Sequence, residues 1–390
     1  MVITIVCDVL GRANNGTTIA ALNLIDSLKK RGHTVRVVCS DAERKGQEGF
    51  YVVPTLDLGP FNNYMKKNGV SLAKADKRII EAAIDGADVV HFMIPFAMGA
   101  KAARLAHKRG IPVTAGFHCQ AENFTSHVFL KDVWLANHLF YRFIWLNSYR
   151  YCTRIHYPTQ FIRDTFEKAI RRETPGAVIS NGVNCAFREK PVLRAPEHAG
   201  KFVIHFTGRF SKEKTHRVLI DAADRSKYRD RIQLEFAGDG PLREKLQKRG
   251  RKLPNPPEFG FYSREELVQK LNAADLYVHP AEVEIEAIAC LEAISCGLVP
   301  VIANSKRSAT RYFAIDERNL FKNKSAKSLA SRIDYWIEHP REREEMRALY
   351  RGFVELHEFE NCMDRMEQMI AQAKYEHGLH SANAEGHHAA

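Results

Sequence analysis

The sequence predicts an α/β protein built from two doubly wound, Rossmann-like domains that face a central cleft. Short apolar, β-branched runs alternate with segments of helical periodicity, which is typical of a parallel sheet covered on both faces. The same pattern begins a second time near Phe202. A length of 390 residues is also ample for two domains that each bury a core.

In the first half, strands and helices follow one another along the chain. Residues 2–7 are expected to form an apolar strand, which the loop 11–16 follows. Apolar residues then recur at helical spacing over residues 17–31, and Gly32 closes that helix. Further strands are predicted at residues 35–39, 88–92 and 112–115, with a helix at 100–109.

The second half repeats this order. Its strands are predicted at residues 202–206, 234–237, 276–278 and 299–302, and its helices at 215–223, 242–248 and 285–295. Residues 191–201 contain two prolines and a glycine, as expected of a linker. We therefore expect domains at 1–195 and 196–355, a helix at 356–376 that packs back towards the first domain, and a disordered tail at 377–390.

Composition narrows the class of protein. With 45% hydrophobic and 27% charged residues, the chain resembles an ordinary globular protein. It has no apolar run of about 18 residues, so no membrane-spanning helix is expected. The start of the chain lacks a basic leader, and the eight cysteines show no CxxC spacing. We therefore expect a cytosolic protein with reduced thiols and without a signal peptide.

The formal charge of +12 is unevenly distributed. Residues 1–200 hold 27 Lys and Arg against 17 Asp and Glu, whereas residues 201–390 hold 31 against 29. A basic half joined to a nearly neutral half predicts that one domain faces an anionic partner. Nucleic acid, a membrane and a phosphorylated substrate are all compatible with this charge.

Two segments of the second half are suited to a diphosphate. Residues 208–215 follow a strand and open a helix, where free N–H groups and the helix dipole favour an anion. Arg209 and Lys214 add two cations to this segment. Gly238 and Gly240 end another strand, where glycine allows the backbone to approach a ligand closely. Each segment alone is also compatible with ordinary solvated residues.

Glu284 and Glu292 form a stronger pattern, eight residues apart. If the helix begins near Ala287, Glu284 lies in the loop before it and Glu292 about a turn and a half inside, at roughly 3.6 residues per turn. The neighbours of Glu292 are apolar, so its carboxylate should be partly buried and should need a partner. The alternative is structural: Glu284 caps the helix and Glu292 forms a salt bridge.

Together these segments resemble the retaining glycosyltransferases of the GT-B fold, family 4. Glu284 and Glu292 match the family's paired glutamates, and residues 296–301 match its small residue and Gly-x-Pro-Val, with one extra residue before the proline. Arg209 and Lys214 match its Gly-Arg-Leu…Glu-Lys-Gly motif. Residues 238–241 match its Gly-x-Gly-Pro turn, and residues 180–184 resemble its Asn-Gly-Val-Asp turn.

A narrower resemblance is to the group that glucosylates diacylglycerol and other glycolipid precursors. It rests on residues 14–18, Asn-Asn-Gly-Thr-Thr, and on residues 118–123, which read His-x-Gln-x-Glu-Asn. The chain departs from the family where Phe-Gly is usual and Glu286-Ala287 stands here. The missing glycine would alter the approach of the backbone to the donor, and Glu286 would place a carboxylate near its phosphates.

The resemblance implies a role for each matching residue. Arg209 and Lys214 would neutralise the leaving diphosphate, Glu284 would bind a hydroxyl of the transferred sugar, and Glu292 would bind the ribose. His118 would contact the sugar at the reacting centre. Because no Asp-x-Asp motif is present, neither a metal nor another cofactor is expected. The expected catalytic residues are His118, Glu284, Arg209 and Lys214, and the expected donor-binding residues are Gly16, Arg209, Lys214, Gly238, Gly240, Glu284, Ala287 and Glu292.

The acceptor is predicted from the basic half. Lys101, Arg104 and Lys108 share one helix face, and a second basic cluster comprises Lys66, Lys67, Lys74, Lys77 and Arg78. Residues 133–151 interleave seven aromatic residues with arginine, a composition that suits a membrane interface. The alternative is that these aromatics pack inside the domain.

We therefore expect glucose to be transferred from a UDP-linked donor to a lipid such as diacylglycerol, at the cytoplasmic surface of an anionic membrane. Two alternatives remain open. A soluble transferase would use a small-molecule or polysaccharide-precursor acceptor. A nucleic-acid-binding protein would explain the charge, but it would leave Glu284 and Glu292 without a role, so no nucleic-acid partner is expected.

Overall fold

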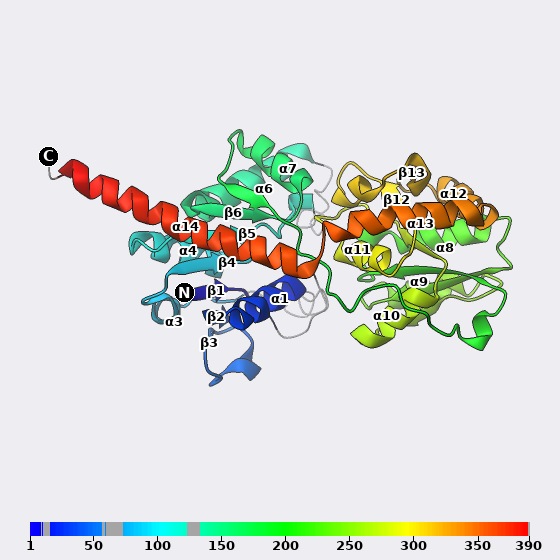
Figure 1. Ribbon diagram of the computed structural model, residues 1–390, viewed down its shortest axis with the longest axis horizontal. Coiled ribbons are helices and arrows are strands. Elements are labelled where there is room, and N and C mark those ends of the chain that lie inside the picture. The colour runs from blue at the N-terminus through cyan, green and yellow to red at the C-terminus, as the bar shows by residue number, and fades with distance from the viewer. Residues whose placement is uncertain (9, 11–15, 57–58, 60–72, 123–132, 389–390) are drawn as a thin grey trace. The chain divides into compact units, whose positions relative to one another are not determined.

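The computed structural model describes the chain apart from residues 9, 11–15, 57–58, 60–72, 123–132 and 389–390, with side chains described as far as Leu379 (Figure 1). The chain divides into two compact units. The first unit comprises Met1–Asn181 and Cys362–Ala390, and the second unit comprises Gly182–Asn361. The sequence placed the domain boundary at residue 195, whereas the N-terminal segment of the first unit ends at Asn181.

The first unit contains a seven-stranded parallel sheet. Almost all apolar residues of its central strands are buried, as expected for a parallel sheet with both faces covered, whereas those of the edge strands are half-buried. The strand order is β3-β2-β1-β4-β5-β6-β7. The strands are β1 (Val2–Val6), β2 (Thr34–Cys39), β3 (Phe50–Val52), β4 (Val89–Phe92), β5 (Val113–Gly116), β6 (Arg154–Tyr157) and β7 (Gly176–Val178).

Helices connect these strands. The Asp76 carboxylate caps one of them by accepting from the N–H groups of Arg78 and Ile79, and the Thr159 hydroxyl caps another. The helices are α1 (Gly16–Lys30), α3 (Lys77–Ile84), α4 (Ala97–Lys108), α6 (Trp134–Asn147) and α7 (Gln160–Ile170).

The C-terminal helix α14 (Phe359–His388) packs on the first unit from Cys362 onwards. Among the described residues, the ion pairs Arg31–Asp364, Arg31–Glu367, Arg154–Glu376 and Lys374–Asp88 hold it there, and His33 Nε2 lies 2.7 Å from Glu367 Oε1. The sequence predicted disorder from residue 377, whereas in the structure the helix continues to His388.

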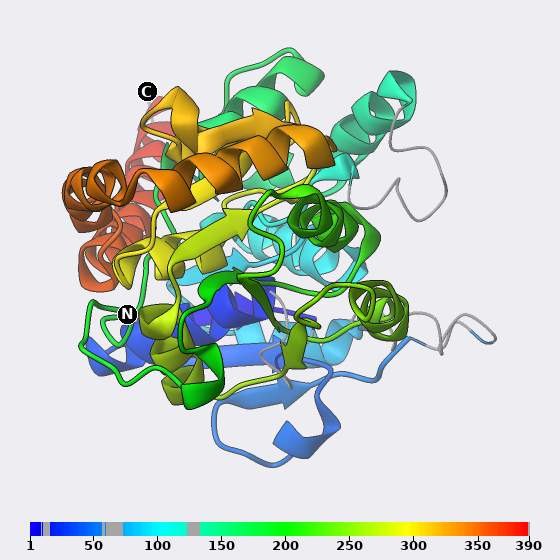
Figure 2. The same ribbon diagram turned by 90° about the vertical axis from the view of Figure 1, so that its right-hand side faces the viewer.

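The second unit contains a six-stranded parallel sheet in the order β10-β9-β8-β11-β12-β13. Helix α12 packs against α8, and α13 packs against α11 (Figure 2). The strands are β8 (Phe202–Thr207), β9 (Ile232–Ala237), β10 (Glu258–Gly260), β11 (Leu276–His279), β12 (Pro300–Asn304) and β13 (Leu320–Lys322). The helices are α8 (His216–Arg225), α9 (Arg243–Gly250), α10 (Arg264–Ala273), α11 (Ile288–Ser295), α12 (Ala326–Glu338) and α13 (Pro340–Glu355).

Both sheets confirm the predicted class of two doubly wound, Rossmann-like domains. In each sheet the strand order reverses once, between β1 and β4 in the first unit and between β8 and β11 in the second. Ligands of such sheets bind outside the carboxyl ends of the strands at this reversal. A ligand site is therefore expected at the loops that follow these four strands. None of the helices in the described parts of the chain has the length and apolar character that crossing a bilayer requires.

Candidate functional site

Two loops of the second unit meet at its strand reversal. One loop follows β8 and the other follows β11, and the two are 70 residues apart in sequence where Lys214 approaches Glu284. The Glu282 N–H donates to the Glu213 carbonyl at 2.8 Å, and the Thr215 hydroxyl donates to the Pro280 carbonyl. The structure thus brings two of the segments that the sequence singled out into direct contact.

A chain of polar side chains lies at the centre of this contact. The Lys214 ammonium forms an ion pair with Glu284 Oε1, and His279 Nε2 lies 3.2 Å from the same oxygen. The Tyr277 hydroxyl lies 3.3 Å from His279 Nδ1. His279 and Tyr277 were not predicted from the sequence, because one histidine at the end of a buried strand is most often structural.

The Glu284 carboxylate is ionised at neutral pH. Burial alone would raise its pKa, but the Lys214 ammonium and the hydrogen bond from His279 lower the pKa to about 2. Its side chain is 13% exposed and that of Lys214 is 19% exposed. A fixed anion and a fixed cation are therefore both partly accessible, one suited to hydroxyl groups and the other to phosphate.

Glu292 occupies a different environment. Helix α11 begins at Ile288, so Glu284 lies in the preceding loop and Glu292 just over one turn inside the helix. The half-buried Glu292 side chain makes no hydrogen bond or ion pair with any described residue, which contradicts the salt-bridge alternative. Burial raises the pKa of Glu292 to about 7, although the charge of Arg264 acts in the opposite direction. A carboxylate left in this state is available to a ligand.

Two residues of these loops adopt a backbone conformation that normally favours glycine. Thr215 has φ 48° and Ala287 has φ 66°. Thr215 follows Lys214, where the family motif has glycine, and this departure was missed from the sequence. Ala287 also replaces a family glycine. Non-glycine residues in the left-handed region are uncommon and occur preferentially at functional sites.

The glycines after β9 have a structural explanation. A Cβ on Gly238 would lie 2.2 Å from the Gly208 carbonyl oxygen, and one on Gly240 would lie 2.8 Å from Phe210 N and O. Glycine is therefore required so that the turn after β9 can pack against the turn after β8, whether or not a ligand approaches it. The side chain of Arg209, between these positions, is half-buried.

The other acidic residues of the β11 loop are enclosed. Glu286 is only 4% exposed, so its carboxylate is largely removed from the surface on which a diphosphate would bind. Glu282 is equally buried and pairs with Arg307 at 3.3 Å and Lys324 at 2.7 Å. These pairs leave Glu284 as the partly exposed carboxylate of the β11 loop, beside Lys214 of the β8 loop.

In the first unit, His118 follows the end of β5. The centroid of its ring lies 5.6 Å from that of the His156 ring. Burial, together with the neighbouring His156 and His91, holds the pKa of His118 well below the usual range. His118 Nε2 is buried and has no hydrogen-bond partner among the described residues. Gly16 is the exposed first residue of α1. Residues 14–15 and Asn123, which the sequence also singled out, lie outside the described residues.

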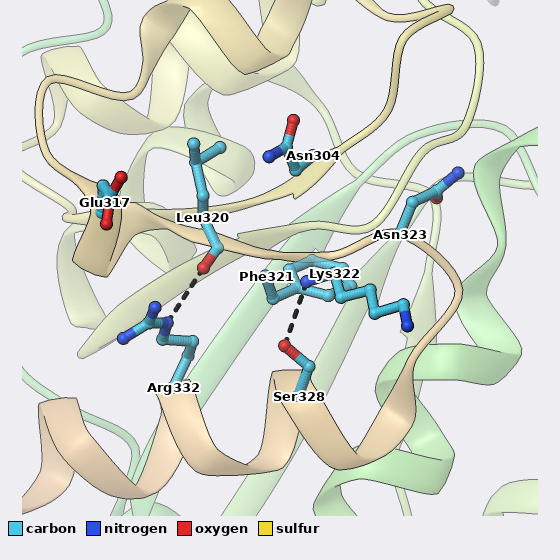
Figure 3. A pocket seen from close by; sticks show the side chains of 8 residues that line it. All are labelled: Asn304, Glu317, Leu320, Phe321, Lys322, Asn323, Ser328 and Arg332. Carbon is cyan, nitrogen blue, oxygen red and sulfur yellow. Dashed lines mark hydrogen bonds between the residues drawn. The ribbon is translucent and has the colours of Figure 1, made fainter.

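Two other features of the second unit do not involve the predicted residues. A cavity of about 540 Å³ lies beside the edge strand β13, where Arg332 donates to the Leu320 carbonyl and Ser328 accepts from the Lys322 N–H (Figure 3). His198, Glu235 and Glu258 have ligand-type atoms within 4.8 Å of one another. The Lys270 ammonium already pairs with both carboxylates of that group, at 3.0 and 3.3 Å.

Known proteins resemble the chain over nearly its whole length. The family Glycosyltransferase Family 4 matches residues 14–187, and the family Glycosyl transferases group 1 matches residues 190–351. A GDP-mannose-dependent alpha-mannosyltransferase of Corynebacterium glutamicum is 28% identical over 74% of this chain and 68% of its own. The alpha-monoglucosyldiacylglycerol synthase of Streptococcus pneumoniae is 23% identical over the same shares, 74% and 68%.

Solved structures resemble it as well. Anabaena HepE, solved in complex with UDP-glucose, has a TM-score of 0.74 at 15% identity and covers 95% of this chain and 100% of its own. The catalytic domain of a Helicobacter pylori cholesterol-alpha-glucosyltransferase is 50% identical over 39% of this chain and 96% of its own, with a TM-score of 0.38. With its two parallel sheets, the chain belongs to the glycosyltransferases of the GT-B fold, with a family 4 first half and a group 1 second half.

Proposed function

We propose that this glycosyltransferase moves glucose, with retention of configuration and without a metal, from UDP-glucose to a lipid acceptor at the cytoplasmic face of a membrane. The observation that carries the proposal is the Lys214–Glu284 ion pair at the strand reversal, with the unpaired Glu292 on the next helix. A diphosphate needs a cation, and sugar and ribose hydroxyls need acceptors, so the three side chains match a nucleotide sugar.

The chemistry follows from where charge develops. As the glycosidic bond breaks, negative charge grows on the diphosphate, and the cations of Lys214 and Arg209 are fixed near the start of α8 to stabilise it. Glu284 holds a hydroxyl of the sugar, and Glu292 holds the ribose. His118 is a neutral imidazole, because burial lowers its pKa, so it contacts the sugar as a hydrogen-bonding group without adding a second charge.

Helix α6 supports a lipid acceptor. Leu135, Leu139, Phe143 and Leu146 are 50–60% exposed and recur at helical spacing, so they form one apolar stripe. On the opposite side of the helix, the buried Tyr141 hydroxyl accepts from the Ala121 N–H at 3.1 Å, in the loop that carries His118. One helix therefore links an exposed apolar surface to the loop of a candidate catalytic residue.

Only part of the aromatic segment contributes to that surface. Tyr141 and Tyr149 are buried, where they contact the ring of Phe117, as the packing alternative predicted. Trp134 and Phe143 are 70% and 60% exposed. Two exposed aromatic rings beside apolar side chains suit the interface of a bilayer.

Charge favours an anionic lipid surface. On α4, Arg104 and Lys108 are exposed and Lys101 is half-exposed, and none of the three forms an ion pair within the described residues. Each Lys or Arg near an anionic bilayer contributes about 1 kcal/mol of attraction. The names of relatives such as the monoglucosyldiacylglycerol synthase point to the same class of acceptor.

Transfer is tested by incubating the purified protein with UDP-glucose, UDP-galactose and GDP-mannose, each with diacylglycerol, a sterol or a soluble sugar acceptor. We expect glycolipid to form with UDP-glucose and not with the other two donors. If product forms only with the soluble sugar acceptor, the acceptor is a soluble molecule and not a lipid. Thermal stabilisation by an oligonucleotide, and by none of the nucleotide sugars, would favour nucleic-acid binding instead.

Membrane binding is tested by vesicle flotation. Wild type should float with anionic vesicles at low salt and bind neutral vesicles weakly. Salt should weaken this binding, because the Debye length falls from about 10 Å at 0.1 M to about 3 Å at 1 M. Reversing Lys101, Arg104 and Lys108 to Glu should release the protein, and so should Leu139→Ser with Phe143→Ser.

The control for the apolar change is Leu349→Ser on α13, which is 63% exposed in the second unit. This variant should float like wild type. All variants should keep their activity on a detergent-solubilised acceptor, because none of these side chains is assigned to the chemistry. A wild-type protein that stays with the soluble fraction at low salt would contradict the membrane part of the proposal.

A further inference from the structure

The end of β5 is shaped around the ring of His118. Strand β5 ends at Gly116, whose carbonyl accepts from the Tyr149 hydroxyl at 3.2 Å. After Phe117 the chain turns, and the His118 ring folds back over the Gly116 Cα. A Cβ on Gly116 would lie 2.6 Å from His118 Nε2 and 2.7 Å from its Cδ2. Gly116 does not have a positive φ, so glycine is required here for space and not for backbone conformation.

A second histidine lies on the same face of the sheet. His91 of β4 is paired with Thr114 of β5, two residues before Gly116, so His91 and Gly116 share a face. The Nδ1 atom of His91 lies 2.9 Å from the Thr114 hydroxyl, which fixes the ring. Its Nε2 atom lies 3.7 Å from the position that a Cβ on Gly116 would take. The Nε2 atoms of His91 and His118 therefore approach one point above Gly116.

Both of these nitrogens are buried, and neither has a hydrogen-bond partner among the described residues. His91 itself is completely buried. A buried polar atom without a partner destabilises the fold by roughly 1–3 kcal/mol. Two such atoms at one point are difficult to explain by packing, since an apolar side chain would fill the same space at lower cost.

We propose that Gly116 and His91 are positioning residues for His118. Gly116 provides the space that the His118 ring occupies, and His91, fixed by Thr114, forms the polar wall beside it. The inference rests on the proposed function, in which His118 contacts the sugar at the reacting centre. It explains why a glycine ends β5 and why a histidine is buried beside it.

The central test is Gly116→Ala. The added methyl group comes too close only to the movable His118 ring, and its next neighbour, His91 Nε2 at 3.7 Å, is at ordinary contact distance. The ring should therefore swing away while the sheet remains folded. A displacement of about 1 Å can reduce turnover by up to about a hundredfold. We expect kcat to fall tenfold or more, with the KM for the nucleotide sugar within twofold of wild type. The matched control is Gly352→Ala on α13, where a Cβ meets nothing within 4 Å.

The double variant separates positioning from general damage. In a His118→Ala background the ring is gone, so Gly116→Ala should change neither kcat nor the melting temperature any further. His91→Phe keeps the ring but removes both nitrogens, and it should likewise lower kcat only when His118 is present. An equal loss of kcat from Gly116→Ala with and without His118 would overturn the proposal. A wild-type kcat in the Gly116→Ala single variant would also overturn it.

The melting temperatures keep this test independent of the proposed function. If wild type transfers no sugar at all, the proposed function fails, but the stability cycle still applies. Gly116→Ala should then lower the melting temperature only when His118 is present. The same loss in both backgrounds would show that the Gly116 methyl group meets something other than that ring.

Discussion

Glu292 offers the sharpest test of the site, because binding and stability should respond to it in opposite directions. Its half-buried carboxylate has no hydrogen-bond or ion-pair partner among the described residues, and burial raises its pKa from 4.5 to about 7. A group of this kind binds its proton more tightly in the folded protein than in the unfolded chain. The ionised form therefore destabilises the protein without ligand, fully above pH 7 and progressively less as the pH falls towards 4.5.

The size of the effect follows from the pKa difference. One pKa unit corresponds to 1.36 kcal/mol, so the raised pKa of Glu292 sets an upper limit of about 3 kcal/mol. Solvent reaches part of this side chain and screens its charge, which reduces the expected value to about 1–2 kcal/mol. For a domain of this size, each kcal/mol shifts the melting temperature by about 2–4 °C.

The assay is thermal unfolding of Glu292→Gln and wild type at pH 8 and pH 5, each with and without UDP-glucose. Without ligand, the variant should melt at a higher temperature than wild type at pH 8, and the difference should shrink at pH 5. Stabilisation by UDP-glucose and sugar transfer should both be lost. Glu345→Gln, at an exposed position on α13, is the control and should change neither property. A variant that is less stable at pH 8, or that is still stabilised by UDP-glucose, would refute the assignment.

The remaining predictions concern the charges, the imidazole and the backbone of the site. Lys214→Ala and Arg209→Ala should each weaken UDP binding by about 1.5–3 kcal/mol in calorimetry, and unchanged affinity in both would exclude the phosphate role. Lys214→Ala should also destabilise the protein at pH 7, and adding Glu284→Gln should restore much of that stability. His118→Ala should lower kcat far more than donor affinity, and a loss confined to KM would reduce it to a binding residue. Ala287→Gly should raise the free energy of unfolding in urea by about 1 kcal/mol, since φ 66° disfavours alanine; a decrease would argue against this backbone conformation.

The sequence predicted the strands and loops that carry the candidate site well, because the signals that define them are local. Alternating apolar runs identified the strands, and the eight-residue spacing placed Glu284 before α11 and Glu292 within it. The doubly wound order then requires the loops after β8 and β11 to be neighbours. That order is what brings Lys214 and Glu284 together across 70 residues of sequence.

What could not be predicted depends on packing between distant segments. His279 contacts Glu284 only because of the direction in which its side chain leaves β11, and no spacing rule reports that direction. Both faces of α6 carry aromatic residues, so the sequence could not distinguish the buried Tyr141 from the exposed Phe143. The sequence suggested that Gly238 allows the backbone to approach a ligand, whereas the Gly208 carbonyl alone already excludes a side chain at this position.

The two departures from the family's glycines are best understood through backbone geometry. Thr215 and Ala287 both keep the left-handed conformation that glycine would adopt without strain. At Thr215, the hydroxyl donates to the Pro280 carbonyl, a contact that glycine could not make and that ties the β8 loop to the β11 loop. Part of the strain at this position is therefore offset by a bond that holds Lys214 beside Glu284. At Ala287, the same conformation starts α11 at Ile288 and so sets Glu292 at its place in the helix. Both substitutions thus retain the backbone path on which the candidate site depends.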